Sequence, residues 1–453
     1  MPLFGRGDAP YDGRVTQTPA GGRPVVSVLT LGCKLNQSDS ESIARRMAGE
    51  GVHIVDRPVR GASAFVINSC SVTHVADRKA RHLVRMARRL SPGAQIVLTG
   101  CYAETAPADI GQLTGADVVL RNADKPAIPD RILERLTGRG DPAAGCPTPV
   151  SNRLRTRAFI KIQEGCNELC AFCIVPYTRG REESVPIADT VRQVQAREAE
   201  GVLEVVLTGT QLGNYGRDLG WPREEQGPRR LLAELLERTS IPRIRLSSLQ
   251  AQDITPGLLD LWRDARLCPH FHIPLQSGSD AVLGPMRRRY TANDYRAAIA
   301  LIREGVPGVA ITSDVIAGFP GETDADFEAT LQLCEETLFA AMHCFPYSRR
   351  PQTGAERMNG HLSPPVRRAR LERLLTVARH TSEAFRREQI GRRMAVLWEQ
   401  ESDGLWEGLT GNYVRVYTAA DAALGNTLRP ARLTCLHADG MRGELAPEDT
   451  HGQ

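Results

Sequence analysis

Three cysteines with the spacing CxxxCxxC lie in one short segment, at Cys166, Cys170 and Cys173. Thiolates are soft ligands that favour zinc or iron–sulfur clusters. Either site normally takes four protein ligands, and no further cysteine or histidine lies close to this segment. With three thiolates, one iron keeps an open position that can chelate S-adenosylmethionine and cleave it reductively to a radical. The spacing predicts such a [4Fe–4S] cluster, with a zinc knuckle as the alternative.

A second set of three cysteines follows predicted strands near the start of the chain. Cys33, Cys70 and Cys101 come one or two residues after the apolar runs in VVSVLTLG, AFVINS and QIVLTG. The carboxyl ends of parallel strands line one crevice of an open sheet, so these thiols are expected to converge. The alternative is three separate buried cysteines that pack as small hydrophobic residues. Convergence predicts a second cluster with an exposed iron, suited to sulfur delivery.

Strand and helix signals alternate over the first 145 residues. Apolar runs predict buried strands at 25–31, 64–68, 95–100 and 117–121, with helices at 38–51 and 74–90. This alternation is typical of an open, mostly parallel α/β sheet. Asp39 and Glu41 are expected to mark a helix start. We expect a disordered lead over 1–23, an N-terminal α/β domain over 24–145 and then a Gly/Pro-rich linker.

A longer alternation begins at residue 158. Its predicted strands are 158–162, 203–209, 243–248, 270–275, 309–318 and 340–348. Its predicted helices are 187–200, 229–239, 291–305 and 323–337. Six strand–helix units are too few for a complete eight-unit barrel, so a partial, open (β/α)6 barrel is expected over 152–388.

The end of the chain has a different texture. Ser363 and two prolines begin a long predicted helix, and nine arginines against three glutamates lie between Arg367 and Arg393. This helix is either a solvated connector or an electrostatic contact with RNA phosphates. After Gly391, short alternating runs predict a small antiparallel all-β barrel over 389–449. The expected fold class is therefore α/β with this added barrel.

Bulk composition narrows the class of protein. A hydrophobic content of 41% and a charged content of 24% are ordinary for a globular protein, and no apolar run is long enough to span a membrane. The N-terminus lacks the apolar core of a secretion signal, so a cytoplasmic location is expected. Eleven cysteines in a reducing compartment favour metal binding over disulfides. The net charge of +4 does not by itself imply nucleic acid.

Seven segments over residues 25–448 resemble the methylthiotransferase branch of the radical-SAM superfamily. They are TLGCKLNQSDSE, NSCSVTHVADRKAR, LTGCYAE, GCNELCAFCIVPYTRGR, HIPLQSGSDAVLGPMRRRYT, DVIAGFPGETDADFE and FPYSRRPQTGAERM. The resemblance implies an N-terminal methylthiotransferase domain, a radical-SAM partial barrel and a C-terminal TRAM domain for RNA contact. It implies two [4Fe–4S] clusters, one on Cys166, Cys170 and Cys173 and an auxiliary one on Cys33, Cys70 and Cys101.

The reaction implied by the resemblance consumes two molecules of S-adenosylmethionine. One donates a methyl group to sulfur at the auxiliary cluster, and the other supplies the radical that converts C–H to C–SCH3. The segment LGCKLNQ resembles the branch that modifies N6-threonylcarbamoyladenosine at C2, beside the tRNA anticodon. Related branches act on isopentenyladenosine, usually with GCQMN, or on a ribosomal protein side chain, with GCPKN. A non-catalytic RNA-binding zinc protein is the alternative from a different class.

Further contacts are predicted at strand ends, where small and polar residues can approach a ligand. Thr210, Ser247, Gln276 and Gly318 are the predicted contacts with S-adenosylmethionine, and a turn-forming role is the alternative for each. No catalytic residue is assigned beyond the two clusters, and His272 is expected to be structural. The expected partners are a tRNA anticodon stem-loop and an electron-donor protein of the flavodoxin or ferredoxin type, with neither membrane nor DNA.

Overall fold

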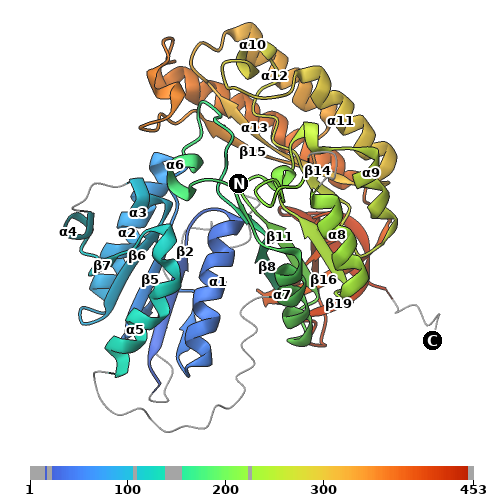
Figure 1. Cartoon of the computed structure of the whole chain (residues 1–453). Helices are drawn as coiled ribbons and strands as arrows, with labels where there is room; N and C mark the ends of the chain where they lie inside the picture. The colour runs from blue at the N-terminus through green and yellow to red at the C-terminus, as the bar shows by residue number, and fades with distance from the viewer. Residues whose placement is uncertain (1–15, 18–22, 106–109, 138–155, 223–226, 447–453) are drawn as a thin grey trace.

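The computed structural model describes residues 16–17, 23–105, 110–137, 156–222 and 227–446. Three units follow one another along these residues: a sheet with helices on both faces, a curved sheet with outer helices, and a small barrel (Figure 1). The predicted linker and most of the predicted lead lie outside the described residues. Within the lead, β1 (Thr16–Gln17) pairs in parallel with β4 (Val59–Arg60). No described helix is both long enough and apolar enough to cross a membrane.

The first unit is a five-stranded parallel sheet in the order β3-β2-β5-β6-β7. In that order the strands are His53–Val55, Val25–Thr30, Ala64–Ser69, Gln95–Gly100 and Val118–Val119. Helices cover both faces: Val66 packs with residues of α1 and α5, whereas Ile67 packs with residues of α2. Two buried faces explain why the strands are continuous apolar runs. The helices are α1 (Lys34–Gly49), α2 (His74–Leu90), α3 (Cys101–Thr105), α4 (Ile110–Thr114), the 3-10 helix η1 (Asn122–Ala127) and α5 (Ile128–Thr137).

The open parallel sheet confirms the predicted fold, with differences at its edges. β3 was not predicted because three residues are too few to show a pattern, and β7 has two residues where five were expected. α1 begins at Lys34, directly after Cys33. The expectation that Asp39 and Glu41 mark the start of a helix was therefore wrong, since both are buried inside α1.

The second unit is a curved sheet of six parallel strands. They are β8 (Arg157–Lys161), β11 (Glu204–Thr208), β12 (Arg243–Leu246), β13 (His270–His272), β14 (Ala310–Ala317) and β15 (Ala341–Pro346). β8, β11 and β12 pair in one half, β13, β14 and β15 pair in the other, and a bridge between Ser248 and His272 joins the halves. Among the described strands β8 and β15 do not pair, so the barrel stays open as predicted.

Helices follow the strands around the outside of this barrel. They are α7 (Ile187–Ala199), α8 (Gly227–Arg238), α9 (Pro256–Leu259), α11 (Ala292–Gly305), α12 (Asp324–Thr337) and α13 (Pro364–Arg387). Shorter elements occupy the loops: β9 (Gln163–Glu164), α6 (Val175–Arg179), β10 (Glu183–Ser184), α10 (Asp280–Leu283), and the 3-10 helices η2 (Leu212–Asn214), η4 (Ala251–Asp253), η5 (Asp260–Arg263) and η6 (Gly354–Arg357). Capping boxes at Thr291 and Thr323 begin α11 and α12.

The third unit is a closed barrel of five strands around a core that includes Trp398. The strands are β16 (Arg393–Ser402), β17 (Leu405–Thr410), β18 (Arg415–Thr418), β19 (Thr427–His437) and β20 (Gly440–Leu445). The prediction of an antiparallel barrel was wrong at one place, because β18 and β20 pair in parallel. Closure needs that pairing, since it joins the β16–β17–β18 meander to the β19–β20 hairpin, and the pairing of β16 with β19 leaves no open edge.

The arginines of α13 largely serve the fold. Arg370 is buried and pairs with Glu322 at 2.5 Å and Asp324 at 2.6 Å. Arg373 pairs with Glu328 at 2.7 Å, and Arg386 donates to the carbonyl of Asp439 in the C-terminal barrel. The helix therefore connects the two barrels through internal contacts.

Candidate functional site

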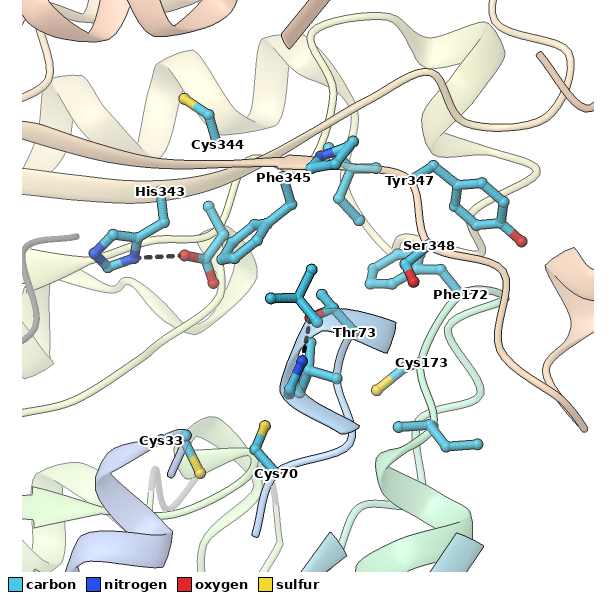
Figure 2. Close-up of a pocket in the computed structure, with 18 of the residues that line it drawn as sticks. Cys33, Cys70, Thr73, Phe172, Cys173, His343, Cys344, Phe345, Tyr347 and Ser348 are labelled. Atoms are coloured by element: carbon cyan, nitrogen blue, oxygen red, sulfur yellow. Dashed lines mark hydrogen bonds and ion pairs between the residues drawn. The ribbon is translucent and has the colours of Figure 1, made fainter. Parts of the chain in front are cut away.

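A cavity of about 620 Å3 lies between the N-terminal sheet and the partial barrel. Cys33 and Cys70 line it from the first unit, and Cys173 lines it from the loop before α6 in the second. Figure 2 shows Cys33 and Cys70 near the start of α2 and Cys173 on the facing segment. Each predicted thiol set thus contributes to the wall of the same cavity.

The N-terminal cysteines follow three strands, β2, β5 and β6, whose carboxyl ends lie close together. Gly32 has a φ of +98°, and a Cβ there would lie 2.6 Å from the Cβ of Cys70. At Gly100, where φ is +93°, a Cβ would lie 2.3 Å from the carbonyl oxygen of Ser69. The Asn36 amide donates to two strand-end carbonyls, at 2.7 and 3.0 Å. Only glycine fits these two turns, which hold the ends of β2, β5 and β6 together.

Positive charge surrounds these thiols. Cys33 is the residue immediately before α1, next to the positive end of the helix dipole. Burial acts to lower the pKa of Arg179, but the Cys101 and Cys33 thiols, together with acidic neighbours, raise that pKa above its usual range. The two cysteines therefore lie close to one guanidinium.

Asp39 holds that guanidinium in place. It accepts hydrogen bonds from Lys125 at 2.6 Å, Lys161 at 2.8 Å and Arg179 at 3.4 Å. Burial acts to raise the pKa of Asp39, but the three cations outweigh burial and keep the pKa well below its ordinary value. Arg179 also bonds Glu164 and Asn36. Asp39 thus links the N-terminal domain to Lys161 and Arg179 of the partial barrel.

The barrel cysteines lie on the loop from β9 to α6, and donors surround their sulfur atoms. The Arg288 guanidinium lies 3.3 Å from Sγ of Cys170, and the Glu168 N–H lies 3.4 Å from Sγ of Cys166. Burial raises the pKa of both Cys166 and Cys173 to about 12. A group that binds the sulfur atoms of Cys166 and Cys173 must therefore displace their protons, as a metal centre does.

The spacing of the sulfur atoms tests zinc against a cluster. Tetrahedral zinc, with Zn–S bonds of about 2.3 Å, holds its ligand sulfurs roughly 4 Å apart. Over the described residues, one His/Cys/Asp/Glu group has ligand atoms within 4.8 Å of one another, and it contains no cysteine. Neither thiol set forms so compact a group among the described residues.

That compact group is His272, Asp314 and His343, from β13, β14 and β15. Asp314 lies 3.3 Å from Nε2 of His272 and 2.9 Å from Nδ1 of His343. Asp314 and His343 line the cavity, and Figure 2 shows His343 on its wall. Burial acts to raise the pKa of Asp314, but the two histidines more than offset this and keep it ionised. Burial lowers the pKa of His272.

Comparison with known protein families gives one match for the N-terminal unit and one for the partial barrel. Residues 160–334 match the radical SAM superfamily, and residues 25–121 match the uncharacterized protein family UPF0004. The threonylcarbamoyladenosine tRNA methylthiotransferase MtaB of Bacillus subtilis is 35% identical, covering 86% of this chain and 89% of its own length. The chain belongs to the radical-SAM methylthiotransferase family. This family's members use S-adenosylmethionine and [4Fe–4S] clusters. Because the chain belongs to this family, it is an enzyme that transfers a methylthio group.

Other relatives of this methylthiotransferase differ in their named substrate. The MtaB protein of Thermotoga maritima is 36% identical, covering 86% of this chain and 90% of its own. A tRNA-2-methylthio-N(6)-dimethylallyladenosine synthase of Geobacter sulfurreducens is 33% identical, covering 93% and 97%.

Among solved structures, the radical S-adenosylmethionine methyltransferase TsrM of Kitasatospora setae, with cobalamin and a [4Fe–4S] cluster bound, has a TM-score of 0.53 at 14% identity. The match covers 85% of this methylthiotransferase and 80% of TsrM. At that identity the likeness shows the fold alone, and it confirms the predicted fold class.

The four predicted S-adenosylmethionine contacts of this methylthiotransferase have different surroundings. Gln276, with a φ of +65°, lines the cavity. Thr210 and Ser247 have buried hydroxyls that bond no described protein group, so both could accept a ligand partner. Gly318 is a turn residue: its N–H donates to Glu322 at 3.0 Å, and Arg367 fills the space where a Cβ would lie.

Sequence reasoning missed several residues at this site. His272 was expected to be structural, which stays a prediction, but its bond to the cavity-lining Asp314 was not foreseen. The signal available was Asp314, a lone charge inside the apolar run VAITSDVIAG. Arg179 and Arg288, which approach the thiols, gave no signal because basic residues are common throughout the chain.

Proposed function

We propose that this chain is a tRNA methylthiotransferase that acts on N6-threonylcarbamoyladenosine beside the anticodon and inserts the methylthio group at C2 of the base. The observation that carries the proposal is the single cavity whose wall includes cysteines of both sets, Cys33 and Cys70 on one side and Cys173 on the other. One space can therefore present a substrate carbon to a radical source and to a sulfur donor.

The ligand assignments are part of this proposal. We assign the radical-SAM cluster to Cys166, Cys170 and Cys173, and the auxiliary cluster to Cys33, Cys70 and Cys101. When bound, these clusters supply reductive cleavage of S-adenosylmethionine and the sulfur to be methylated and transferred. The Arg288 and Arg179 side chains neutralise the charge of the two thiolate sets.

Other residues shape the space for substrate. Asp314 and His343 offer polar contacts on the barrel wall, and Gln276 offers an amide near them. Thr210 and Ser247 do not line this cavity, but their buried, unpartnered hydroxyls leave both as candidate contacts with S-adenosylmethionine. Phe172 and Val72 also line the cavity and can exclude water around a flat base.

Two lines of support favour threonylcarbamoyladenosine. The segment LGCKLNQ is of the threonylcarbamoyladenosine type, and three relatives named MtaB are 34–36% identical over most of the chain. Dimethylallyladenosine is the second candidate, because relatives with that named substrate reach 33% and 35% identity. A flavodoxin- or ferredoxin-type protein is the proposed electron donor.

Anaerobic reconstitution tests the substrate. The protein is loaded with iron and sulfide, then given S-adenosylmethionine, a reductant and anticodon stem-loops carrying either modified adenosine. Mass spectrometry of the nucleosides should show a methylthio product from the threonylcarbamoyladenosine RNA. A product from the dimethylallyladenosine RNA alone would establish the second candidate instead.

A further inference from the structure

Helix α2 presents one continuous basic face to solvent. The exposed residues recur at helical spacing, at Val75, Arg78, Lys79, His82, Arg85 and Arg89. The opposite face is buried against the N-terminal sheet through residues such as Leu83 and Val84. The helix has one acidic residue, Asp77, which is buried and pairs with Arg350 at 2.8 Å. The exposed face therefore has positive charge without a carboxylate.

The charges on this face are unpaired. Over the described part of the chain, Arg78, Lys79, Arg85 and Arg89 make no ion pair and no side-chain hydrogen bond. The other cations of α2 differ, since Arg81 donates to Tyr102 and Arg88 pairs with Asp117. Four adjacent cations that the fold does not neutralise repel one another, and an external polyanion relieves that repulsion.

The basic face leads into the cavity. The first turns of α2 and the residues before it line that space, through Val72, Thr73, Val75, Ala76 and Lys79. At a rise of 1.5 Å per residue, the ten steps from Lys79 to Arg89 span about 15 Å. A row of cations of that length, with Lys79 in the cavity wall, suits the backbone of a nucleic-acid strand that places one nucleotide in the cavity.

We propose that the exposed face of α2 binds the sugar–phosphate backbone of the tRNA next to the nucleotide that enters the cavity. This inference rests on the proposed function, which makes tRNA the substrate. An acidic electron-donor protein also carries negative charge, but the phosphates flanking an inserted nucleotide must pass the mouth of the cavity. The arginines of α13 are less suited, because Arg370, Arg373 and Arg386 already have partners within the chain.

The test measures binding of an anticodon stem-loop to the full-length, cluster-loaded protein over a range of salt concentrations. The double variant R85Q/R89Q removes two cations of the face that lie away from the cavity lining. Each lost phosphate contact should lower the slope of log K against log salt by about 0.7–0.9. We expect a decrease of roughly 1.5 in slope and at least tenfold weaker binding at low salt. R85K/R89K, which keeps the charge, should retain the wild-type slope.

A matched control removes the same charge elsewhere. Arg263 and Arg296 are exposed on outer elements of the barrel and pair with Asp260 and Glu336. R263Q/R296Q should bind RNA as the wild type does, and thermal unfolding and iron content verify that every variant is folded and loaded.

The outcomes separate this inference from the proposed function. Wild-type affinity and slope in R85Q/R89Q would overturn the role of α2, even if the stem-loop is still methylthiolated. Unchanged RNA binding with weaker binding of a reduced flavodoxin would overturn it in favour of a protein partner. If R85Q/R89Q loses RNA affinity as expected, but the wild-type protein methylthiolates neither stem-loop, the role of α2 is upheld and the proposed reaction is rejected.

Discussion

Tyr413, in the loop between β17 and β18, stacks on His270 of β13 with ring centroids 4.6 Å apart. The Arg245 guanidinium lies 4.8 Å from the Tyr413 ring centroid, and Nζ of Lys34 lies 5.8 Å from it. Lys34 follows Cys33 in the N-terminal domain, and Arg245 belongs to the partial barrel. One aromatic ring of the C-terminal barrel thus contacts both other units. It covers the end of the partial barrel where the strands begin.

Removing this ring should weaken the docking of all three units. Tyr413→Ala deletes a large, half-buried side chain and should lower the free energy of unfolding by about 2 kcal/mol. Tyr413→Phe keeps the stacking surface and loses a hydrogen bond, so it should cost about 1 kcal/mol. Denaturant unfolding measures both values. Equal losses in the two variants would show that the ring itself contributes little.

Glu204 should make stability depend on pH in the acid range. Burial acts to raise the pKa of Glu204, but Arg243 and Arg245 more than offset this and lower it to about 2. In an unfolded chain the pKa of glutamate is about 4.3. A lowered folded pKa gives stability that is complete above about pH 4.3 and is lost as the pH falls through about 2.

Glu204→Gln is the measurement of that contribution. Glu204 accepts from Arg243 at 2.8 Å and Arg245 at 2.9 Å, so the variant should be about 3 kcal/mol less stable at neutral pH. The difference from wild type should shrink as the pH falls from about 4.3 to about 2. A difference that stays constant over this range would mean that ionisation of Glu204 is not its source.

The two thiol sets should separate by function. Cys70→Ala should lose about half of the bound iron, keep reductive cleavage of S-adenosylmethionine, and form no methylthio product. Cys173→Ala should lose both activities, because cleavage depends on the radical-SAM cluster. Iron and sulfide analysis, with assays of deoxyadenosine and of the modified nucleoside, measures these outcomes. Methylthiolation at the wild-type rate by Cys70→Ala would refute the auxiliary site.

Asp314→Asn should impair product formation without loss of the clusters. The amide cannot accept from His272 and His343 as the carboxylate does, so the barrel wall rearranges. Displacement of groups that position a substrate can cost on the order of a hundredfold in rate. Iron content should match wild type, since Asp314 belongs to neither cysteine set. Wild-type turnover would assign Asp314 to the fold alone.

Much of this protein could be predicted from local patterns. The six strands of the partial barrel, the long helices and the closed C-terminal barrel follow from apolar runs, caps and turns that involve neighbouring residues. The convergence of Cys33, Cys70 and Cys101 also followed from sequence, because parallel strands must end at one edge of their sheet. The parallel pairing of β18 with β20 did not, since pairing direction depends on how the barrel closes.

The sequence by itself determined which thiols are available, which strands present them, and the family to which the chain belongs. Only the tertiary structure decided that both sets border one cavity, that Asp39 binds Lys125, Lys161 and Arg179, and that Tyr413 closes the barrel. The same holds for Arg370, Arg373 and Arg386 of α13, which are bonded internally, and for the basic face of α2, which is not. Contacts of this kind join residues far apart in the chain, and neither periodicity nor spacing encodes which distant partners meet.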